Sequence, residues 1–205
     1  MGTDEYSTGN KTVPTLPFLL APSAFNGLLI RWNGLDTAGF AAWEFLPGMR
    51  FSERAAWWRG GSERSGAHEG LDICWYRTID GRRRSLGAGA RVPLVFAGEV
   101  VSIVDDFLGA SVFVSHAHRD DEGRRLHTVY GHVRPRPGLT PGSILEDGDA
   151  IGTIADTTGN KRDVPPHLHI TLALIDRAAG SEKLDWDALH DRTRVFLLDP
   201  VIIMK

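Results

Sequence analysis

The segment HEGLD at 68–72 places two potential metal ligands on either side of a glycine. In a helix, His68 and Asp72 would share a face and Glu69 could act as a base. However, Gly70 costs a helix about 1 kcal/mol relative to alanine, and the flanks supply neither an apolar stripe nor a cap. In a strand, residues 68, 70 and 72 lie on one face, Gly70 leaves space for an ion, and Glu69 points the other way. We therefore predict a strand that presents His68 and Asp72 as a pair of ligands.

A catalytic zinc site needs a third protein ligand and keeps one position open. The segment HLH at 167–169 is the best source, because His167 and His169 share one face of a predicted strand. Pro165-Pro166 fixes an extended entry to this strand, and the apolar ITLAL that follows anchors it in a core.

A rival pair, His116 and His118 in SHAHRDDEG, stands at the end of another predicted strand beside a charged turn. We favour two exposed histidines at the tip of a hairpin for this pair. Spacing alone leaves a ligand role open.

Short strands must position these side chains. From residue 67 onward, runs rich in Val, Ile, Thr and aromatic residues alternate with turns of Gly, Pro and Asp, which indicates a mainly β domain. ASVFVSHAH and RLHTVYGHV, separated by RDDEGR, predict a hairpin. Before this domain, residues 1–15 are polar and predict a flexible lead. Residues 16–60 hold four of the six tryptophans and predict an N-terminal extension packed on the core.

Composition excludes several classes of protein. The 205 residues carry a formal charge of −3, so nothing global points to nucleic acid or an anionic membrane. Cys74 is the sole cysteine, which excludes a disulfide within the chain. No stretch has the apolar length that spans a membrane, and the polar, acidic MGTDEYSTGN is not a secretory signal.

Taken in order, three motifs resemble the M23 (LytM, lysostaphin-like) zinc metallopeptidases. HEGLD is similar to the family's H-x-G-x-D signature, VYGH to its Y-x-H segment, and PPHLHITL to its P-H-L-H segment. The resemblance implies that His68, Asp72 and His169 hold Zn²⁺, and that His132 and His167 are catalytic. It further implies an antiparallel β-sheet groove of the LytM type, with a duplicated hybrid-motif or barrel-sandwich-like fold, over residues 61–205.

The implied activity is zinc-dependent endopeptidase cleavage of peptidoglycan cross-links, with a cell-envelope, periplasmic or secreted location. Zinc would activate a water molecule, and two histidines would move protons or stabilise the oxyanion. Two alternatives remain. One is a non-catalytic M23-like module that binds or activates amidases. The other is an unrelated metal-binding β protein built on the HAH pair at 116–118.

Asn26 and Asn33 are candidates for one further role. In the M23 family, a segment before the catalytic domain sometimes covers the groove and places an Asn at the open metal position, which makes the enzyme latent. Both residues precede glycine, and we favour ordinary turn residues for them. The latent arrangement predicts that deletion of residues 1–60 raises activity.

Overall fold

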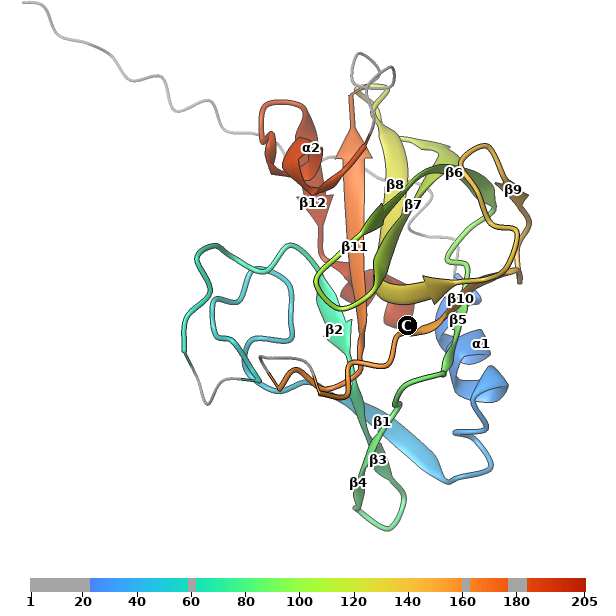
Figure 1. Cartoon of the computed structure of the whole chain (residues 1–205), viewed down its shortest axis with the longest axis vertical. Helices are drawn as coiled ribbons and strands as arrows, with labels where there is room; N and C mark the ends of the chain where they lie inside the picture. Colours follow the sequence, from blue (N-terminus) through green and yellow to red (C-terminus); the bar gives the residue numbers. More distant parts are fainter. Residues whose placement is uncertain (1–22, 59–61, 160–162, 177–183) are drawn as a thin grey trace, which may run out of the picture.

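The computed structural model describes residues 23–58, 62–159, 163–176 and 184–205; the predicted flexible lead at 1–15 lies outside these ranges. The described chain is mostly antiparallel β-sheet with few helices, which confirms the mainly β prediction (Figure 1). The strands are β1 (Phe40–Glu44), β2 (Leu71–Ile73), β3 (Trp75–Thr78), β4 (Arg83–Ser85), β5 (Arg91–Pro93), β6 (Gly98–Asp105), β7 (Ala110–Arg119), β8 (Arg125–Pro135), β9 (Ile144–Leu145), β10 (Ala150–Ile154), β11 (Leu168–Ile175) and β12 (Val195–Leu198). The helices are α1 (Phe25–Trp32), α2 (Trp186–His190) and the 3₁₀ helix η3 (Pro200–Met204).

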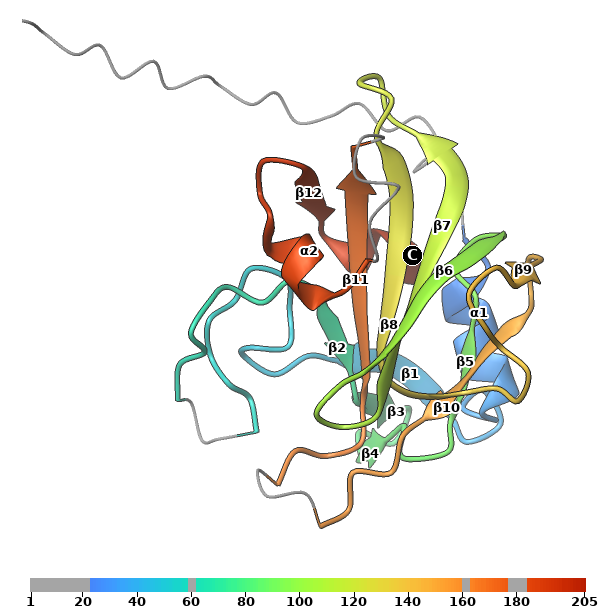
Figure 2. The same ribbon diagram turned by 45° about the horizontal axis from the view of Figure 1, so that its top comes forward.

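Nine strands form one large sheet. Its main path runs β12-β11-β8-β7-β6-β9, while β2 pairs with β11, and β10 pairs with both β8 and β5. The sheet curves strongly, and α2 lies beside β11 and β12 (Figure 2). A separate sheet with the order β1-β3-β4 extends from the body. Every strand pairing of the described residues is antiparallel, so the site is built on adjacent strands of opposite direction.

The central strands are buried on both faces. Side chains alternate along a strand, and those of β7 follow this rule. Val112 and Val114 enter one hydrophobic cluster, and Phe113 enters the other. On β11, Leu172 joins the first cluster and Ala173 the second. The face of the second cluster also carries the odd-numbered residues nearer the start of β11, where the site lies.

The predicted hairpin at 110–133 is present as β7 and β8, but β8 contains a bulge. Ala110 pairs with Val133 and Val112 with Tyr130, so two residues of β8 lie opposite Ser111 alone. The extra residue is visible in the burial as well. Val129 belongs to the second cluster, whereas Val133, also odd-numbered, belongs to the first. The bulge therefore reverses the facing of β8 around Gly131 and His132.

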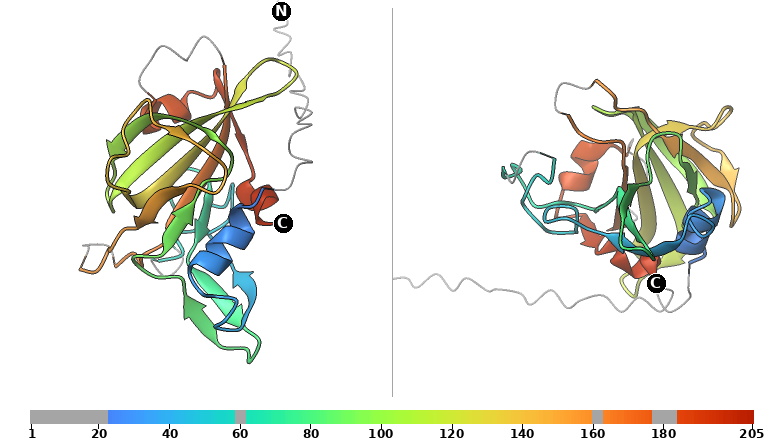
Figure 3. Two further views of the ribbon diagram at one scale, coloured as in Figure 1. Left: turned by 90° about the vertical axis from the view of Figure 1, so that its right-hand side faces the viewer. Right: turned by 90° about the horizontal axis from the view of Figure 1, so that it is seen from below.

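Residues 23–58 share the core of the large sheet. Phe25 and Leu29 of α1 are fully buried in the first cluster, and Trp43 of β1 packs against it. Helix α1 lies next to η3 at the end of the chain (Figure 3). In the part of the chain that the structure describes, no helix is long and apolar enough to cross a membrane.

Candidate metal centre

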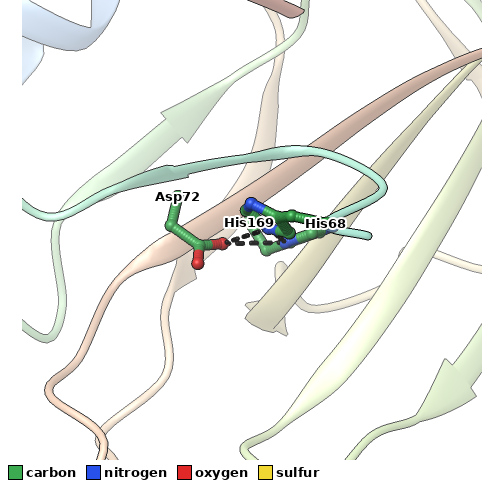
Figure 4. A group of neighbouring side chains, drawn as sticks. All are labelled: His68, Asp72 and His169. Atoms are coloured by element: carbon green, nitrogen blue, oxygen red, sulfur yellow. Dashed lines mark hydrogen bonds and ion pairs between the residues drawn. The ribbon is translucent and has the colours of Figure 1, made fainter. Parts of the chain in front are cut away.

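Three predicted ligands converge on the large sheet. His169 of β11 lies directly opposite Asp72 of β2 in their antiparallel pair, and His68 reaches the same point from the chain before β2. Nδ1 of His169 lies 2.8 Å from Oδ1 of Asp72, and Nε2 of His68 lies 3.2 Å from the same oxygen (Figure 4). All three residues are buried, and one ligand atom from each lies within 4.8 Å of the other two. This buried His-His-Asp group could hold a metal ion.

The strand predicted at 68–72 forms only in its second half. Strand β2 begins after Gly70, so a loop presents His68, and the prediction of a strand face was wrong for this residue. The glycine also has a different role from the one predicted. A Cβ at this position would lie 2.3 Å from the carbonyl oxygen of Ile170 and 2.7 Å from Nε2 of His169. Gly70 therefore allows β11 and its histidine to approach, rather than leaving room for an ion.

Each imidazole has a second partner that fixes its orientation. Nδ1 of His68 lies 3.0 Å from the carbonyl oxygen of Arg50, and Nε2 of His169 lies 2.9 Å from Oγ1 of Thr171. A carbonyl oxygen can only accept, so the Nδ1 of His68 carries the proton and the lone pair of Nε2 points at Asp72. Such outer contacts hold ligating histidines in metal sites.

The carboxylate of Asp72 is held on both sides. Its Oδ2 accepts hydrogen bonds from the indole of Trp57 at 2.8 Å and the guanidinium of Arg64 at 3.0 Å. Burial pushes the pKa of Asp72 upward, but electrostatic interactions with the surrounding imidazoles of His68, His167 and His169 outweigh this effect and hold the pKa well below its usual range. The group is therefore a carboxylate at neutral pH.

The donor set fits a divalent cation. The lone pair of His68 Nε2 and the Oδ1 of ionised Asp72 are both acceptors, yet they lie 3.2 Å apart with Nδ1 of His169 beside them. Acceptors in this position repel one another unless a proton or a metal ion lies between them. Two imidazole nitrogens and one carboxylate oxygen suit zinc.

His132 and His167 lie beside this group. Nδ1 of His167 donates to the carbonyl of Pro165 at 2.8 Å, which leaves its Nε2 3.6 Å from Oδ1 of Asp72. Burial, opposed by the charge of Asp72, lowers the pKa of His167 to about 3, so its ring is neutral at pH 7. The ring centroids of His132 and His167 are 4.8 Å apart, and Nδ1 of His132 faces Asp106 at 3.0 Å.

A cavity of about 710 Å³ opens onto the group. Four of the five predicted site residues line it, together with aromatic side chains: Asp72, His132, His167, His169, Trp58, Phe107 and Trp186. The rings of Trp186 and His169 meet in a T-shaped contact, with their centroids 5.5 Å apart. The cavity exposes the otherwise buried imidazoles of His132, His167 and His169 to molecules that enter it.

Three residues that contact the site could not be predicted from spacing. Arg64 lies in GGSERSG, whose composition indicates only a loop. Trp57 lies just before this loop, and its residue type indicates only apolar surface that packs on the core. Asp106 lies in a turn between two strands and reaches His132 across 26 positions of sequence. For Arg64 and Asp106, the only signal in the sequence was a charged side chain in a loop or turn. No such signal exists for Trp57.

Among the residues that the structure describes, the rival histidine pair does not belong to a group of three potential metal ligands. His116 is buried with 1% exposure, so the predicted exposure of this residue was wrong. Its ring nitrogens lie 3.0 Å from the carbonyl oxygen of Ala97 and 2.8 Å from Oγ1 of Thr128. His118 is partly buried against Phe96, with ring centroids 4.8 Å apart. Both ring nitrogens of His116 are thus occupied by hydrogen bonds within the fold.

The two asparagines proposed as latent-state ligands bond elsewhere. Asn26 lies inside α1 and not in a turn as predicted; its amide donates to the carbonyl of Met204 and accepts from the indole of Trp43, both at 2.8 Å. Asn33 follows α1 and exchanges hydrogen bonds with the backbone of Arg91. Neither carboxamide is brought to the His-His-Asp group.

Comparisons with known proteins give a limited result. No protein-family model matches the sequence, and no curated protein matches it. Among solved structures, cbpa from L. salivarius REN is 22% identical, with 79% of this chain and 87% of that chain covered and a TM-score of 0.44. A point mutant of the catalytic domain of the prophage-encoded M23 protein EnpA from Enterococcus faecalis is 23% identical, with 65% and 85% covered and a TM-score of 0.38. A putative peptidase M23 from Pseudomonas aeruginosa is 20% identical, with 87% and 61% covered and a TM-score of 0.42. Similarity at this level assigns neither a family nor an activity to the chain.

Proposed function

We propose that this protein is a zinc metalloendopeptidase that hydrolyses peptide bonds in peptidoglycan cross-links. The observation that carries the proposal is the convergence of His68, Asp72 and His169 beside an open cavity, with two further histidines on the cavity wall. Three protein ligands with access for a small molecule are the pattern of a catalytic zinc site rather than a structural one.

The chain supplies both the ligands and the proton-transfer groups that this chemistry needs. Zinc held by His68, Asp72 and His169 would supply Lewis acidity that activates water and polarises the scissile carbonyl. His167 directs an unprotonated Nε2 toward this group, because its Nδ1 donates to a backbone carbonyl. His132 is held in the same way through Nδ1. Each ring can take up or release a proton at Nε2 during attack and departure.

Sequence motifs support the substrate class. HEGLD, VYGH and PPHLHITL occur in the order of the M23 metallopeptidase motifs, and their histidines and aspartate are the residues that meet at the cavity or directly beside it. A cavity of about 710 Å³ accommodates several residues of a peptide. We extend the proposal to a cell-envelope, periplasmic or secreted location, where such cross-links occur.

The test combines metal analysis with digestion on the same samples. We expect about one zinc per chain in the wild type, and loss of the metal in His68→Ala, Asp72→Ala and His169→Ala. His132→Ala and His167→Ala should keep the metal but lose about 10²- to 10⁴-fold of the turnover, since their proposed work is proton transfer. Purified peptidoglycan is the substrate, and mass spectrometry of the released fragments identifies the bond.

Matched controls separate the alternatives. His116→Ala removes a buried histidine away from the cavity and should leave zinc content unchanged. Loss of zinc in His116→Ala alone would show that the metal site has been misplaced. A zinc-loaded wild type that binds peptidoglycan but releases no fragments would favour a non-catalytic binding or amidase-activating module.

A further inference from the structure

The backbone at His132 is unusual in two respects. It lies in the bulge of β8, where Gly131 and His132 together oppose Ser111, and its φ of 61° is in the left-handed region that non-glycine residues rarely adopt. Without the extra residue, regular alternation would turn His132 toward the first hydrophobic cluster. The bulge places it on the same face as His169. A bulge next to a site commonly redirects one side chain.

One carboxylate contacts this strained residue at two points. Oδ2 of Asp106 accepts the backbone N–H of His132 at 2.9 Å, and Oδ1 lies 3.0 Å from its ring Nδ1. The Asp106 carboxylate is itself fixed: Oδ1 accepts the backbone N–H groups of Leu108 and Gly109, at 2.9 and 2.8 Å. Oδ2 also accepts the hydroxyl of Ser111 at 2.7 Å.

The same network reaches the candidate metal ligands from the other side. The indole N–H of Trp186 donates to Oγ of Ser111 at 3.1 Å, and the Trp186 ring contacts His169. Asp106 is therefore braced by the turn after β6, by β7 and, through Ser111, by α2. Its position is set by three elements, so it can impose an orientation on the residue that it binds.

We propose that Asp106 is the positioning residue of His132: it holds the bulge and keeps the ring proton on Nδ1, so that Nε2 faces the cavity as the acceptor. An ionised carboxylate can accept hydrogen bonds but cannot donate them. The ring nitrogen that faces Asp106 is therefore the one that carries the hydrogen. The inference rests on the proposed function for its catalytic meaning. The orientation and the tautomer can be measured without any substrate.

The first experiment is spectroscopic. Long-range ¹H–¹⁵N spectra near pH 9, where imidazoles are neutral, report which ring nitrogen carries hydrogen; His132→Gln assigns the resonance. Wild-type His132 should be the Nδ1–H tautomer. In Asp106→Ala the ring should exchange between tautomers. The side-chain amide of Asp106→Asn has one oxygen, which can accept from the ring Nδ1 or from the backbone N–H of His132 but not from both. Either the Nδ1–H tautomer or the slow hydrogen exchange of the His132 backbone amide should therefore be lost.

Kinetics give the second readout. With zinc content unchanged, both Asp106 variants should lose about 10- to 100-fold in kcat with little change in KM, as found for outer-shell residues that orient a site. Asp120→Ala is the matched control. Its carboxylate also accepts backbone N–H groups in a turn, from Glu122 at 3.1 Å and Arg124 at 2.8 Å, but it contacts no site residue. This variant should keep the tautomer and kcat.

The outcomes are distinguishable from those of the proposed function. An Nε2–H tautomer of His132 in the wild type would overturn the positioning role, whatever the activity. So would a folded Asp106→Ala that keeps the wild-type tautomer and kcat. A wild type that shows the Nδ1–H tautomer but cleaves no peptide would defeat the proposed peptidase activity and leave the positioning role standing.

Discussion

Asp72 is the residue on which the site depends most directly. Its Oδ1 faces the imidazoles of His68, His169 and, at 3.6 Å, His167, while its Oδ2 accepts hydrogen bonds from Trp57 and Arg64. The two oxygens thus have separate functions, and only Oδ1 is turned toward His68 and His169. Arg64 and Trp57 both precede the HEGLD motif in the sequence. Residues outside the motif therefore supply the hydrogen bonds that orient the carboxylate of Asp72.

Two histidines away from the site give a test at the same scale. Burial lowers the pKa values of His116 and His127 to about 4 each, although backbone carbonyls hydrogen-bonded to the rings oppose this shift. In the unfolded chain both titrate near 6.5. Between about pH 6.5 and pH 4 the unfolded state therefore binds more protons, and stability must fall as the pH falls through this window.

We expect His116→Gln to lose less stability than the wild type between pH 7 and pH 4.5, because glutamine does not titrate. The difference should be about 2–3 kcal/mol, the size of the pKa shift of one buried histidine. Urea unfolding at both pH values measures it. His190→Gln, at an exposed position, is the control and should follow the wild type. An equal loss in His116→Gln and wild type would contradict the assigned burial effect.

At the scale of elements, the pairing of β2 with β11 brings the ligands together, and Gly70 permits it. Gly70→Ala should push β2 away, because its Cβ would lie 2.3 Å from a backbone oxygen that cannot rotate aside. We expect a loss of about 1–3 kcal/mol in the free energy of unfolding, together with at least a tenfold weaker affinity for zinc. Thermal unfolding and metal titration by calorimetry check both.

Gly66→Ala is the matched change, since a Cβ there meets nothing within 4 Å and its backbone is not left-handed. It should leave both quantities unchanged. Wild-type zinc affinity in Gly70→Ala would mean that the approach of β2 to β11 does not set the geometry of the site.

These elements also show which parts of the fold and of the site could be predicted from the sequence. The hairpin of β7 and β8 was predictable because its Val, Ile and aromatic runs flank a charged turn, and β11 because Pro165-Pro166 precedes an apolar run. The bulge was not predictable. Strand β8 is buried on both faces, so a change of facing leaves no break in its apolar pattern. The contacts from Trp57, Arg64 and Asp106 depend on long-range folding that no local pattern records.

For the whole molecule, residues 23–58 are part of the core rather than a detachable cover. Helix α1 contributes the fully buried Phe25 and Leu29, and Asn26 connects it to Met204 near the end of the chain. Deletion of residues 1–60 would expose their apolar partners and also remove Trp57 from Asp72. We expect such a truncation to unfold or aggregate rather than to become activated.

A point variant tests this more gently. Leu29→Ala should lower the free energy of unfolding by about 2–5 kcal/mol, the range for a buried leucine that leaves a cavity. Asp36→Ala, on the exposed chain after α1, should change it by less than about 0.5 kcal/mol. Chemical denaturation of both variants gives the comparison. Wild-type stability in Leu29→Ala would show that α1 contributes little to the fold.

His68 and His169 are 101 residues apart in sequence, yet their ring nitrogens lie 3.2 Å from each other. An ion bound by both would act as a reversible cross-link across most of the strands of the large sheet. Because such an ion binds the folded chain and not the unfolded one, it would stabilise the fold by RT ln(1 + c/Kd), where c is the free zinc concentration, or about 4 kcal/mol when c is about a thousand times Kd. A chelator would therefore remove more than the proposed activity. It would also remove the link between His68 and His169, so the free zinc concentration would set the free energy of unfolding.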